Sequence, residues 1–228
     1  MKFSIVVPVY GSEKILKAGY EEFSAAIGRL GGDYELLYRV DGSPDRSKEV
    51  LDEIAAKDER VRVFSHEPNR GLGYTLRKLF EDARGEFVIY FDADSYLCFD
   101  LSFLGGVVEK MDRADAVIVS RYMLNPILPL HRYLASEAYY LLNKALFGIG
   151  IRDIGSGFVI FRKAALDSLD LKSDGFEIHT EIFVRMARKG FRVLETPLAY
   201  KHWSGGSFRF IRHGLKALVY TLKLRREI

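Results

Sequence analysis

Short apolar runs alternate with helical patterns through the first half of this 228-residue chain. Five of these runs predict strands near residues 2–10, 34–40, 61–65, 86–91 and 116–120. Between the first two runs, apolar residues recur at helical spacing at Leu16, Tyr20, Phe23, Ile27 and Leu30. Strands that alternate with helices predict a mostly parallel sheet with helices on both faces.

The second half of the chain has a less regular pattern. Residues 132–147 and 178–189 predict helices, and residues 158–161 and 191–195 predict strands. In the first of these helices we expect the apolar side chains to face inward, at Leu134, Ala138, Leu141, Leu142 and Ala145.

Composition narrows the class of protein. The hydrophobic content of 48% is ample for one large domain, and the net charge of +3 does not indicate a nucleic-acid partner. The single cysteine, Cys98, excludes an intrachain disulfide and fits a reducing compartment. The apolar run at the N-terminus is too short for a signal peptide, and no stretch approaches the roughly 20 apolar residues of a spanning helix. We therefore expect a cytoplasmic protein, either in solution or on the cytoplasmic face of a membrane.

Polar clusters follow four of the predicted strands. They are Tyr10, Asp41, Asn69-Arg70-Gly71 and Asp92-Ala93-Asp94. In open sheets of this kind, ligands bind beyond the carboxyl ends of the strands. Two carboxylates two residues apart can hold Mg²⁺ or Mn²⁺ against a diphosphate, although the triplet alone is more typical of a solvated turn. Its position beside the other clusters favours the metal site.

In chain order, the motifs resemble family 2 glycosyltransferases of the GT-A fold. They are most similar to the dolichyl-phosphate mannose synthase and polyprenyl-phosphate glycosyltransferase branch. The resemblance rests on Val6–Tyr10, Val40–Asp45, Asn69–Gly73, Asp92–Asp94, Ser120–Tyr122, Arg132 with Ser136 and Asn143, Asp153 with Gly155–Phe158, Gly175–Glu177 with Thr180-Glu181, and Gly190–Pro197. It implies one α/β domain over residues 1–207, with a single Rossmann-like, mostly parallel sheet flanked by helices. Residues 1–120 would bind the nucleotide sugar and residues 121–207 the acceptor.

The resemblance also implies an inverting transfer from a UDP- or GDP-sugar with Mg²⁺ or Mn²⁺. Asp94 would be the main metal ligand, and Asp92 would support the metal or the ribose. Asp41 resembles the family's base-binding aspartate, and an aspartate before glycine also suits a turn. The remaining residues that the resemblance assigns to the donor are Pro8, Tyr10, Glu13, Arg70 and Gly71.

On the acceptor side the resemblance points to Glu181, Arg121 and Arg132. Glu181 follows Thr180 at a predicted helix start, where it would act as a general base or acceptor contact, or complement the helix dipole. If the acceptor is a polyprenyl phosphate such as dolichyl phosphate, its oxygen is already anionic and the two arginines would clamp it. If the acceptor is a hydroxyl group, Glu181 would be the necessary base. A non-catalytic subunit that binds the donor is the third alternative.

Several positions depart from the family pattern. Val40 replaces the first of two aspartates, Ser95 replaces a glutamine, and His202 and Phe208 replace an arginine and a lysine. The basic residues lost at positions 202 and 208 would contact the diphosphate or the acceptor phosphate. These two departures therefore bear on the assignment of mannose and dolichol rather than on the fold.

The last segment, residues 208–228, predicts a basic amphipathic helix. One face carries Phe208, Ile211, Leu215, Leu218, Val219 and Leu222. An adjacent stripe carries Arg209, Arg212, Lys216, Lys223 and Arg226. Such a helix binds an anionic membrane surface or packs on its own domain.

Overall fold

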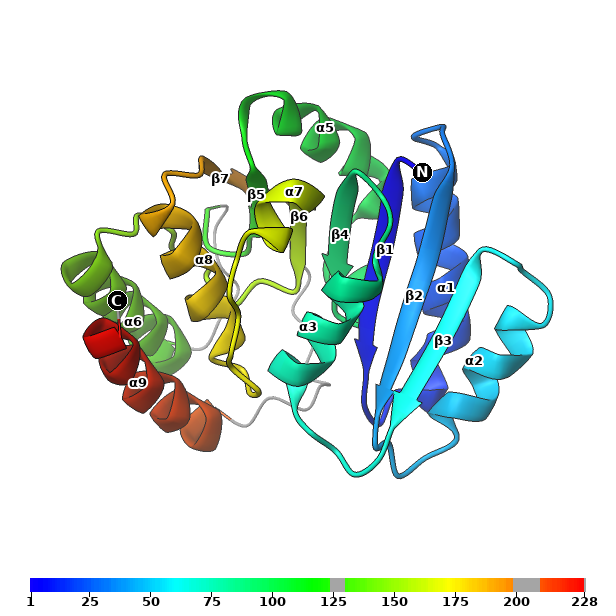
Figure 1. Ribbon diagram of the computed structural model, residues 1–228, viewed down its shortest axis with the longest axis horizontal. Coiled ribbons are helices and arrows are strands. Elements are labelled where there is room, and N and C mark those ends of the chain that lie inside the picture. Colours follow the sequence, from blue (N-terminus) through cyan, green and yellow to red (C-terminus); the bar gives the residue numbers. More distant parts are fainter. Residues whose placement is uncertain (124–129, 199–209, 228) are drawn as a thin grey trace.

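The computed structural model describes residues 1–123, 130–198 and 210–227, without the side chains of residues 130–132, 210–217 and 227. Within these ranges, seven strands form one sheet in the order β3-β2-β1-β4-β6-β5-β7 (Figure 1). Their bounds are β1 Phe3–Val9, β2 Tyr34–Asp41, β3 Val61–His66, β4 Phe87–Phe91, β5 Ala116–Ser120, β6 Phe158–Arg162 and β7 Val193–Pro197. All seven predicted strands are confirmed, with small shifts at their ends.

The sheet is parallel except at β6, which runs antiparallel to both of its neighbours, β4 and β5. The expected mostly parallel α/β class is therefore confirmed. Helices lie on both faces of the sheet and beyond one end of it. Their bounds are α1 Glu13–Gly28, α2 Ser47–Ala55, α3 Leu72–Asp82, α4 Ser95–Cys98, α5 Leu104–Val108, α6 Leu130–Phe147, α7 Lys163–Asp167, α8 Ile178–Arg188 and α9 Phe210–Glu227. The short helices α4, α5 and α7 were not predicted, because four or five residues are too few for a helical period to emerge.

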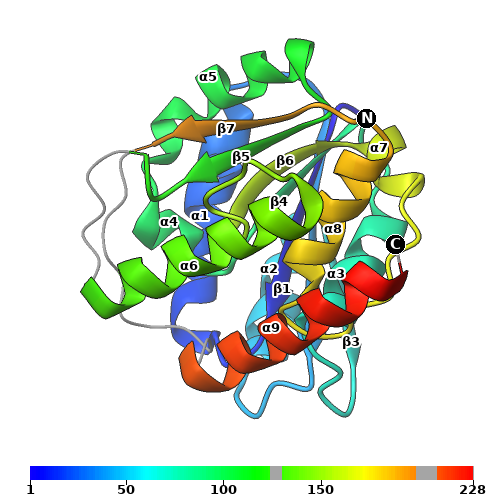
Figure 2. The same cartoon turned by 90° about the vertical axis from the view of Figure 1, so that its left-hand side faces the viewer.

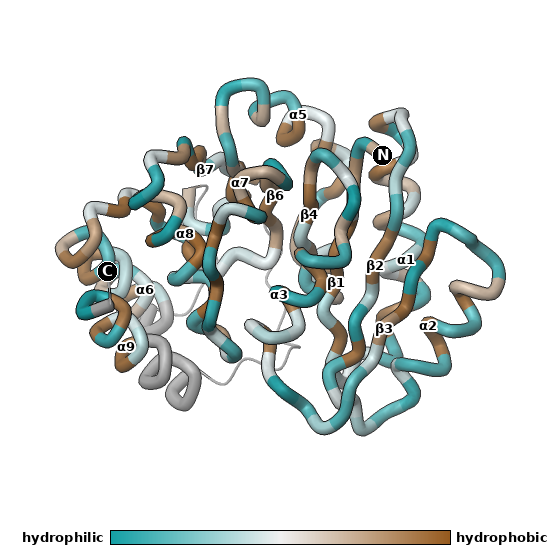
Figure 3. Tube along the Cα trace, in the orientation of Figure 1, coloured by the Kyte–Doolittle hydropathy of each residue, from teal (hydrophilic) through white to brown (hydrophobic). Residues whose placement is uncertain are grey.

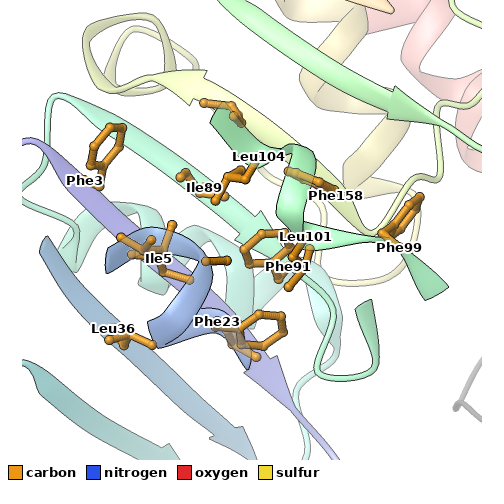
Figure 4. Close-up of a cluster of buried hydrophobic side chains, with 14 of the residues drawn as sticks. Phe3, Ile5, Phe23, Leu36, Ile89, Phe91, Phe99, Leu101, Leu104 and Phe158 are labelled. Carbon is orange, nitrogen blue, oxygen red and sulfur yellow. The ribbon is translucent and has the colours of Figure 1, made fainter. Parts of the chain in front are cut away.

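The alternation of side chains along each strand divides the core into two layers. Along β4, Phe87, Ile89 and Phe91 pack toward α1, whereas Val88 and Tyr90 pack toward α3 and α8. Figure 4 shows the first layer, in which Phe91 lies between Phe23 of α1 and Phe158 of β6. The central strands β1, β4, β5 and β6 are almost entirely buried, and hydrophobic residues predominate along β1 and β4 in Figure 3. The edge strands β3 and β7 are only partly buried. Each fully buried side chain of this kind contributes roughly 1.5–3 kcal/mol.

The orientation of α6 differs from the prediction. Leu134 and Leu141, which were expected to face inward, are 57% and 55% exposed, and Ala138 is also exposed. The reason is that α6 does not cover the sheet: it lies beside α9 at the end of the molecule far from β3 (Figures 1 and 2). The side of α6 that faces the domain makes a polar contact, in which the Tyr139 hydroxyl lies 2.7 Å from the Thr180 hydroxyl of α8.

Helix α9 packs on the domain through a face other than the one predicted. Thr221 and Leu224 are fully buried, and Thr221 Oγ1 lies 2.8 Å from the Tyr139 hydroxyl of α6. Leu218, Val219 and Leu222, from the predicted apolar face, are exposed. The two alternatives for this helix are therefore compatible, since docking on the domain leaves these three apolar side chains in contact with solvent. Among the described residues no helix is both long enough and apolar enough to cross a membrane.

Candidate active site

The strand directions bring the polar clusters to one edge of the sheet. Strands β1 to β5 all end at this edge, which the arrowheads of β1, β2 and β3 mark at the bottom of Figure 1. Tyr10, Asp41, Asp92 and Arg121 lie at or just beyond these ends. The reversed strand β6 begins at the same edge, so the segment 155–157 joins them.

Asp92 is the first carboxylate after β4, and its surroundings fix its position. It shares a sheet face with Tyr90, whose hydroxyl donates a hydrogen bond to Asp92 Oδ1. Its backbone N–H donates to the Gly157 carbonyl at 2.9 Å. A Cβ atom at Gly157 would overlap Asp92 Oδ2 and lie 2.6 Å from Asp92 Cγ. Only glycine at position 157 leaves room for this carboxylate.

Asp94 occupies the N-cap position of α4, and the hydroxyl of the next residue ties this turn to β6. Ser95 is buried and donates to the Gly157 carbonyl at 2.6 Å, so this departure from the family pattern has a structural role. Val40, the other described departure, is a core residue of β2. His202 and Phe208 lie outside the described residues.

The donor set of Asp92 and Asp94 fits a hard divalent cation. Both carboxylates are partly exposed, and Tyr90 orients Asp92 as a second layer of hydrogen bonding orients metal ligands. In the part of the chain that the structure describes, no group of three or more histidine, cysteine, aspartate or glutamate side chains is arranged to hold a metal ion. A cation at this pair would therefore take further ligands from elsewhere, such as diphosphate oxygens and water.

Tyr90 and His179 lie beside the carboxylates and were missed by the sequence prediction. Their rings stack with centroids 5.8 Å apart. Burial, reinforced by the charge of Asp92, raises the pKa of Tyr90 well above its usual value, so its hydroxyl remains a donor. Burial lowers the pKa of His179 although the charge of Asp92 acts in the opposite direction, which favours a neutral imidazole. The alternation of side chains along a strand places Tyr90 on the same face as Asp92, so this residue could have been predicted. His179 could have been noticed because it lies within the family motif that ends at Glu181.

Asp41 anchors the loop that precedes α3. Its Oδ1 accepts the Arg70 N–H at 2.6 Å and lies 2.8 Å from His66 Nε2, and its Oδ2 accepts the Gly71 N–H at 3.0 Å. A carboxylate has about four acceptor positions, so one remains on Oδ2. Arg70 itself is exposed, and its guanidinium lies 3.7 Å from the centre of the Tyr74 ring. These contacts hold a loop that is distant in the sequence, so the turn-forming and base-binding roles of Asp41 stay predictions.

A second polar network joins the turns after β1 and β2. The Glu13 N–H donates to Asp45 Oδ2 at 3.0 Å. Burial would raise the pKa of Asp45, but hydrogen bonds from the Ser47 hydroxyl and the Glu13 N–H outweigh it and lower the pKa. Tyr10 projects beside this network with 45% of its surface exposed, and Pro8 pairs with β2 inside β1.

Arg121 follows β5 and is held by Asp153. Its Nε donates to Asp153 Oδ2 at 2.8 Å and its Nη2 to Oδ1 at 2.6 Å, a bidentate pair. The Nη2 atom also donates to the Gly155 carbonyl at 3.0 Å. Asp153 is itself fixed, because its N–H donates to Glu195 of β7 at 2.9 Å. The side chain of Arg132, the other predicted clamp, lies outside the described residues.

Glu181 does not lie where a general base would. Its side chain is 0% exposed and accepts hydrogen bonds from the backbone of Lys172 and Ser173. The Ser173 hydroxyl and Arg185 Nε fill the remaining positions, at 2.6 and 2.8 Å. The expectation of a base at Glu181 conflicts with this placement, because no lone pair is left for an acceptor's proton. The carboxylate lies in the interior against the turn that contains Lys172 and Ser173, which the sequence pattern did not indicate.

Comparison with known proteins adds a family context. The family model described as Glycosyl transferase family 2 matches residues 4–170. Glycosyltransferase AglD of Haloferax volcanii is 30% identical over 211 residues, which cover 88% of this chain and 33% of AglD. A dolichol-phosphate mannosyltransferase of Pyrococcus furiosus is 28% identical, over 100% of this chain and 67% of that protein. A polyprenol monophosphomannose synthase of Mycolicibacterium smegmatis is 29% identical, over 86% and 76%. The chain thus spans about a third to three quarters of these curated relatives.

Solved structures with similar folds include two sugar-transferring synthases. The glucosyl-3-phosphoglycerate synthase from Mycobacterium tuberculosis, solved with Mn²⁺, UDP-glucose and phosphoglyceric acid, has a TM-score of 0.74 and 18% identity. That match covers 100% of this chain and 80% of the other. The mannosyl-3-phosphoglycerate synthase from Rubrobacter xylanophilus has a TM-score of 0.75 and 18% identity, over 100% and 75%. At this identity the likeness concerns the fold alone, and it confirms the GT-A fold that the motifs predicted.

Proposed function

Because the chain belongs to glycosyl transferase family 2, we propose that it moves a sugar from a nucleotide-diphospho-sugar to a polyprenyl phosphate, with inversion at the anomeric carbon. One observation carries this proposal: a carboxylate pair and a rigidly held arginine flank the same short segment, 155–157. Asp92 lies against Gly157, and Arg121 donates to the Gly155 carbonyl. The carboxylates suit a metal-bound diphosphate, and the planar guanidinium suits a second phosphate.

On the donor side, we place the nucleotide between the turn after β1 and the loop that Asp41 anchors. Tyr10 offers an exposed ring surface, and Asp41 keeps one acceptor position for a base N–H. Arg70 is exposed beside this loop and can approach a phosphate. Asp92 and Asp94 would hold Mg²⁺ or Mn²⁺, which supplies Lewis-acid neutralisation of the leaving diphosphate.

On the acceptor side, an oxygen of the acceptor phosphate attacks the anomeric carbon from the face opposite the diphosphate. The bond between that carbon and the diphosphate oxygen breaks, and the nucleoside diphosphate leaves with the bonding electrons. An anionic phosphate oxygen needs no base, which agrees with the buried and fully bonded state of Glu181. Arg121, oriented by Asp153, would bind the acceptor phosphate. The polyprenyl class is supported by the names of the relatives from P. furiosus and M. smegmatis.

A transfer assay tests this function. The wild-type protein is incubated with Mn²⁺, labelled UDP- and GDP-sugars, and either a short polyprenyl phosphate or 3-phosphoglycerate. We expect label to enter the lipid with one of the donors and to release an equal amount of nucleoside diphosphate. Label that enters only 3-phosphoglycerate would replace the lipid with a soluble acceptor, of the kind bound in the mycobacterial synthase structure. Nucleotide binding without transfer or donor hydrolysis would support a non-catalytic subunit and overturn the proposal.

A lipid acceptor requires that the protein reach a membrane, and we place the contact surface on α6 and α9. The two helices lie side by side, and each exposes apolar side chains, Leu134 and Leu141 on α6 and Leu218 and Leu222 on α9. Exposed basic residues accompany them near the end of α9 at Lys223, Arg225 and Arg226. Apolar side chains next to cations suit the anionic headgroups of a lipid surface.

We expect the wild-type protein to sediment with vesicles that contain phosphatidylglycerol and not with phosphatidylcholine alone. Each basic residue near an anionic surface contributes about 1 kcal/mol, so replacing Lys223, Arg225 and Arg226 with glutamine should weaken binding about 100-fold. Leu218→Gln combined with Leu222→Gln should also release the protein. The control is Phe103→Gln, which removes an apolar side chain from a different part of the surface. Phe103 is 58% exposed, more than Leu218 at 38% or Leu222 at 49%. Equal binding by all variants would contradict the placement.

A further inference from the structure

We propose that Glu181 is a positioning residue, which holds the turn at 172–174 against the start of α3 and so fixes the donor-binding loop at 69–73. The inference rests on the proposed function only in naming that loop as part of the donor site. It assigns to Glu181 a task on the donor side, at a distance from the reacting atoms, instead of proton transfer on the acceptor side.

The first step is the set of hydrogen bonds that the turn donates to Glu181. Both Oε atoms accept the Lys172 N–H, at 3.1 and 3.0 Å. Oε2 also accepts the Ser173 N–H at 2.8 Å and the Ser173 hydroxyl at 2.6 Å. Because three of the four donors belong to two consecutive residues of the turn, the carboxylate determines the path of the backbone there.

The second step joins this turn to α3. The Asp174 carbonyl accepts the Gly73 N–H at 2.8 Å and the Tyr74 N–H at 3.3 Å. The first N–H groups of a helix have no partner within the helix, and the N-cap residue of α3 is Gly71, which has no side chain to bind them. The turn at 172–174 therefore supplies the N-terminal cap of α3 from a distant part of the chain. Arg77 strengthens the join, since its Nε donates to the Ser173 carbonyl at 3.2 Å.

The third step is that the turn and the start of α3 are in close backbone contact. A Cβ atom at Gly73 would overlap the Ser173 carbonyl oxygen and lie 2.8 Å from the Asp174 carbonyl carbon. A Cβ atom at Gly71 would overlap the Asp174 carbonyl oxygen, and Gly71 also has a φ of +96°. These two glycines therefore allow two backbone segments to lie against each other. On its other side, the loop is bound by Asp41 through the Arg70 and Gly71 N–H groups.

The protonation state of Glu181 agrees with this task. Burial would raise the pKa of its carboxyl, but the Ser173 hydroxyl, the two backbone N–H groups and Arg185 lower it. The carboxyl group is thus ionised at neutral pH. A general base that takes up a proton near neutral pH would need a raised pKa instead. The donors that face it come from the turn and from Arg185 on its own helix, 2.8 Å away.

The test compares Glu181→Gln with Glu181→Asp and Ser173→Ala. Glutamine keeps the shape but turns one oxygen into a donor that opposes the backbone N–H groups, and alanine removes only the hydroxyl contact. A matched control is Glu81→Gln, a 58% exposed glutamate on α3 that pairs with Lys78. Affinity for UDP and GDP with Mn²⁺ is measured by calorimetry, kinetic constants are measured from pH 6 to 9, and thermal melting reports folding.

We expect Glu181→Gln to raise the nucleotide Kd and the donor KM together by about 10-fold, as for loss of a charged hydrogen bond. The kcat should change by less than about threefold, with an unaltered pH profile, because no proton is transferred. Ser173→Ala should show a smaller change in the same direction. A large fall in kcat at constant Kd, with loss of one limb of the pH profile, would restore Glu181 as a base. Unchanged constants in folded variants would also overturn the proposal.

Amide hydrogen exchange separates this inference from the proposed function. If Glu181 positions the loop, exchange at residues 70–74 should accelerate in Glu181→Gln, whether or not the wild-type protein binds a nucleotide. If the wild-type protein binds none while exchange responds in this way, the proposed function fails and the positioning role stands. If Glu181→Gln does not fold, exchange in Ser173→Ala decides the question.

Discussion

Adding a single methyl group at Gly157 is expected to abolish sugar transfer while the protein remains folded. In Gly157→Ala the new Cβ would lie 2.6 Å from Asp92 Cγ and 3.0 Å from Asp92 Cβ, so the carboxylate must move. A displacement of about 1 Å at a reacting centre can cost about 100-fold, and we expect at least that loss in kcat/KM. The measurement is initial-rate kinetics with the donor and acceptor identified by the transfer assay.

The control is Gly150→Ala, a nearby glycine whose added Cβ would meet nothing within 4 Å. Its kinetics and melting temperature should match those of the wild type. Because the side chain displaced in Gly157→Ala is a partly exposed carboxylate at the sheet edge, the melting temperature of that variant should fall by only a few degrees. Full activity in a folded Gly157→Ala protein would show that the orientation of Asp92 is not needed.

Neutralising Asp94 is expected to lower the rate of sugar transfer as much as Gly157→Ala does, because it weakens binding of the metal ion. Asp94→Asn keeps the size of the side chain but removes the negative charge that would hold the cation. Changes one layer outside a metal site cost 10–100-fold, so loss of a ligand should lower transfer by more than about 100-fold. Calorimetry should show that Mn²⁺ no longer strengthens nucleotide binding. In the wild type, a chelator should stop transfer, and excess Mn²⁺ or Mg²⁺ should restore it.

Asp52→Asn is the matched control for that experiment. Asp52 is 49% exposed on α2, where it pairs with Lys48 one turn away, and its replacement should leave transfer unchanged. If Asp94→Asn retained wild-type rates and the same response to Mn²⁺, the carboxylate pair would have to be read as the solvated turn that the triplet alone permits.

A feature was predicted correctly where it depends on the local sequence, and wrongly where it depends on what packs against it. Strand β4 was predicted because five consecutive apolar residues, Phe87–Phe91, are buried on both faces, and burial of this kind is a local property of the sequence. The carboxylate pair was found for the same reason, since it immediately follows that strand. The face of α6 was predicted wrongly, because an apolar stripe reports that a helix is amphipathic without saying what covers it.

By itself, then, the sequence determined the α/β class, the strands, the family and the edge where the polar clusters meet. These depend on periodicity and on motifs that are contiguous in the chain. The tertiary structure alone decided that β6 reverses and brings Gly157 against Asp92, and that Asp153 holds Arg121. It also decided that Glu181 is enclosed by the turn that caps α3. Each of these depends on contacts between residues tens of positions or more apart, or on a turn whose path no local pattern records, and such contacts exist only once the strands have paired.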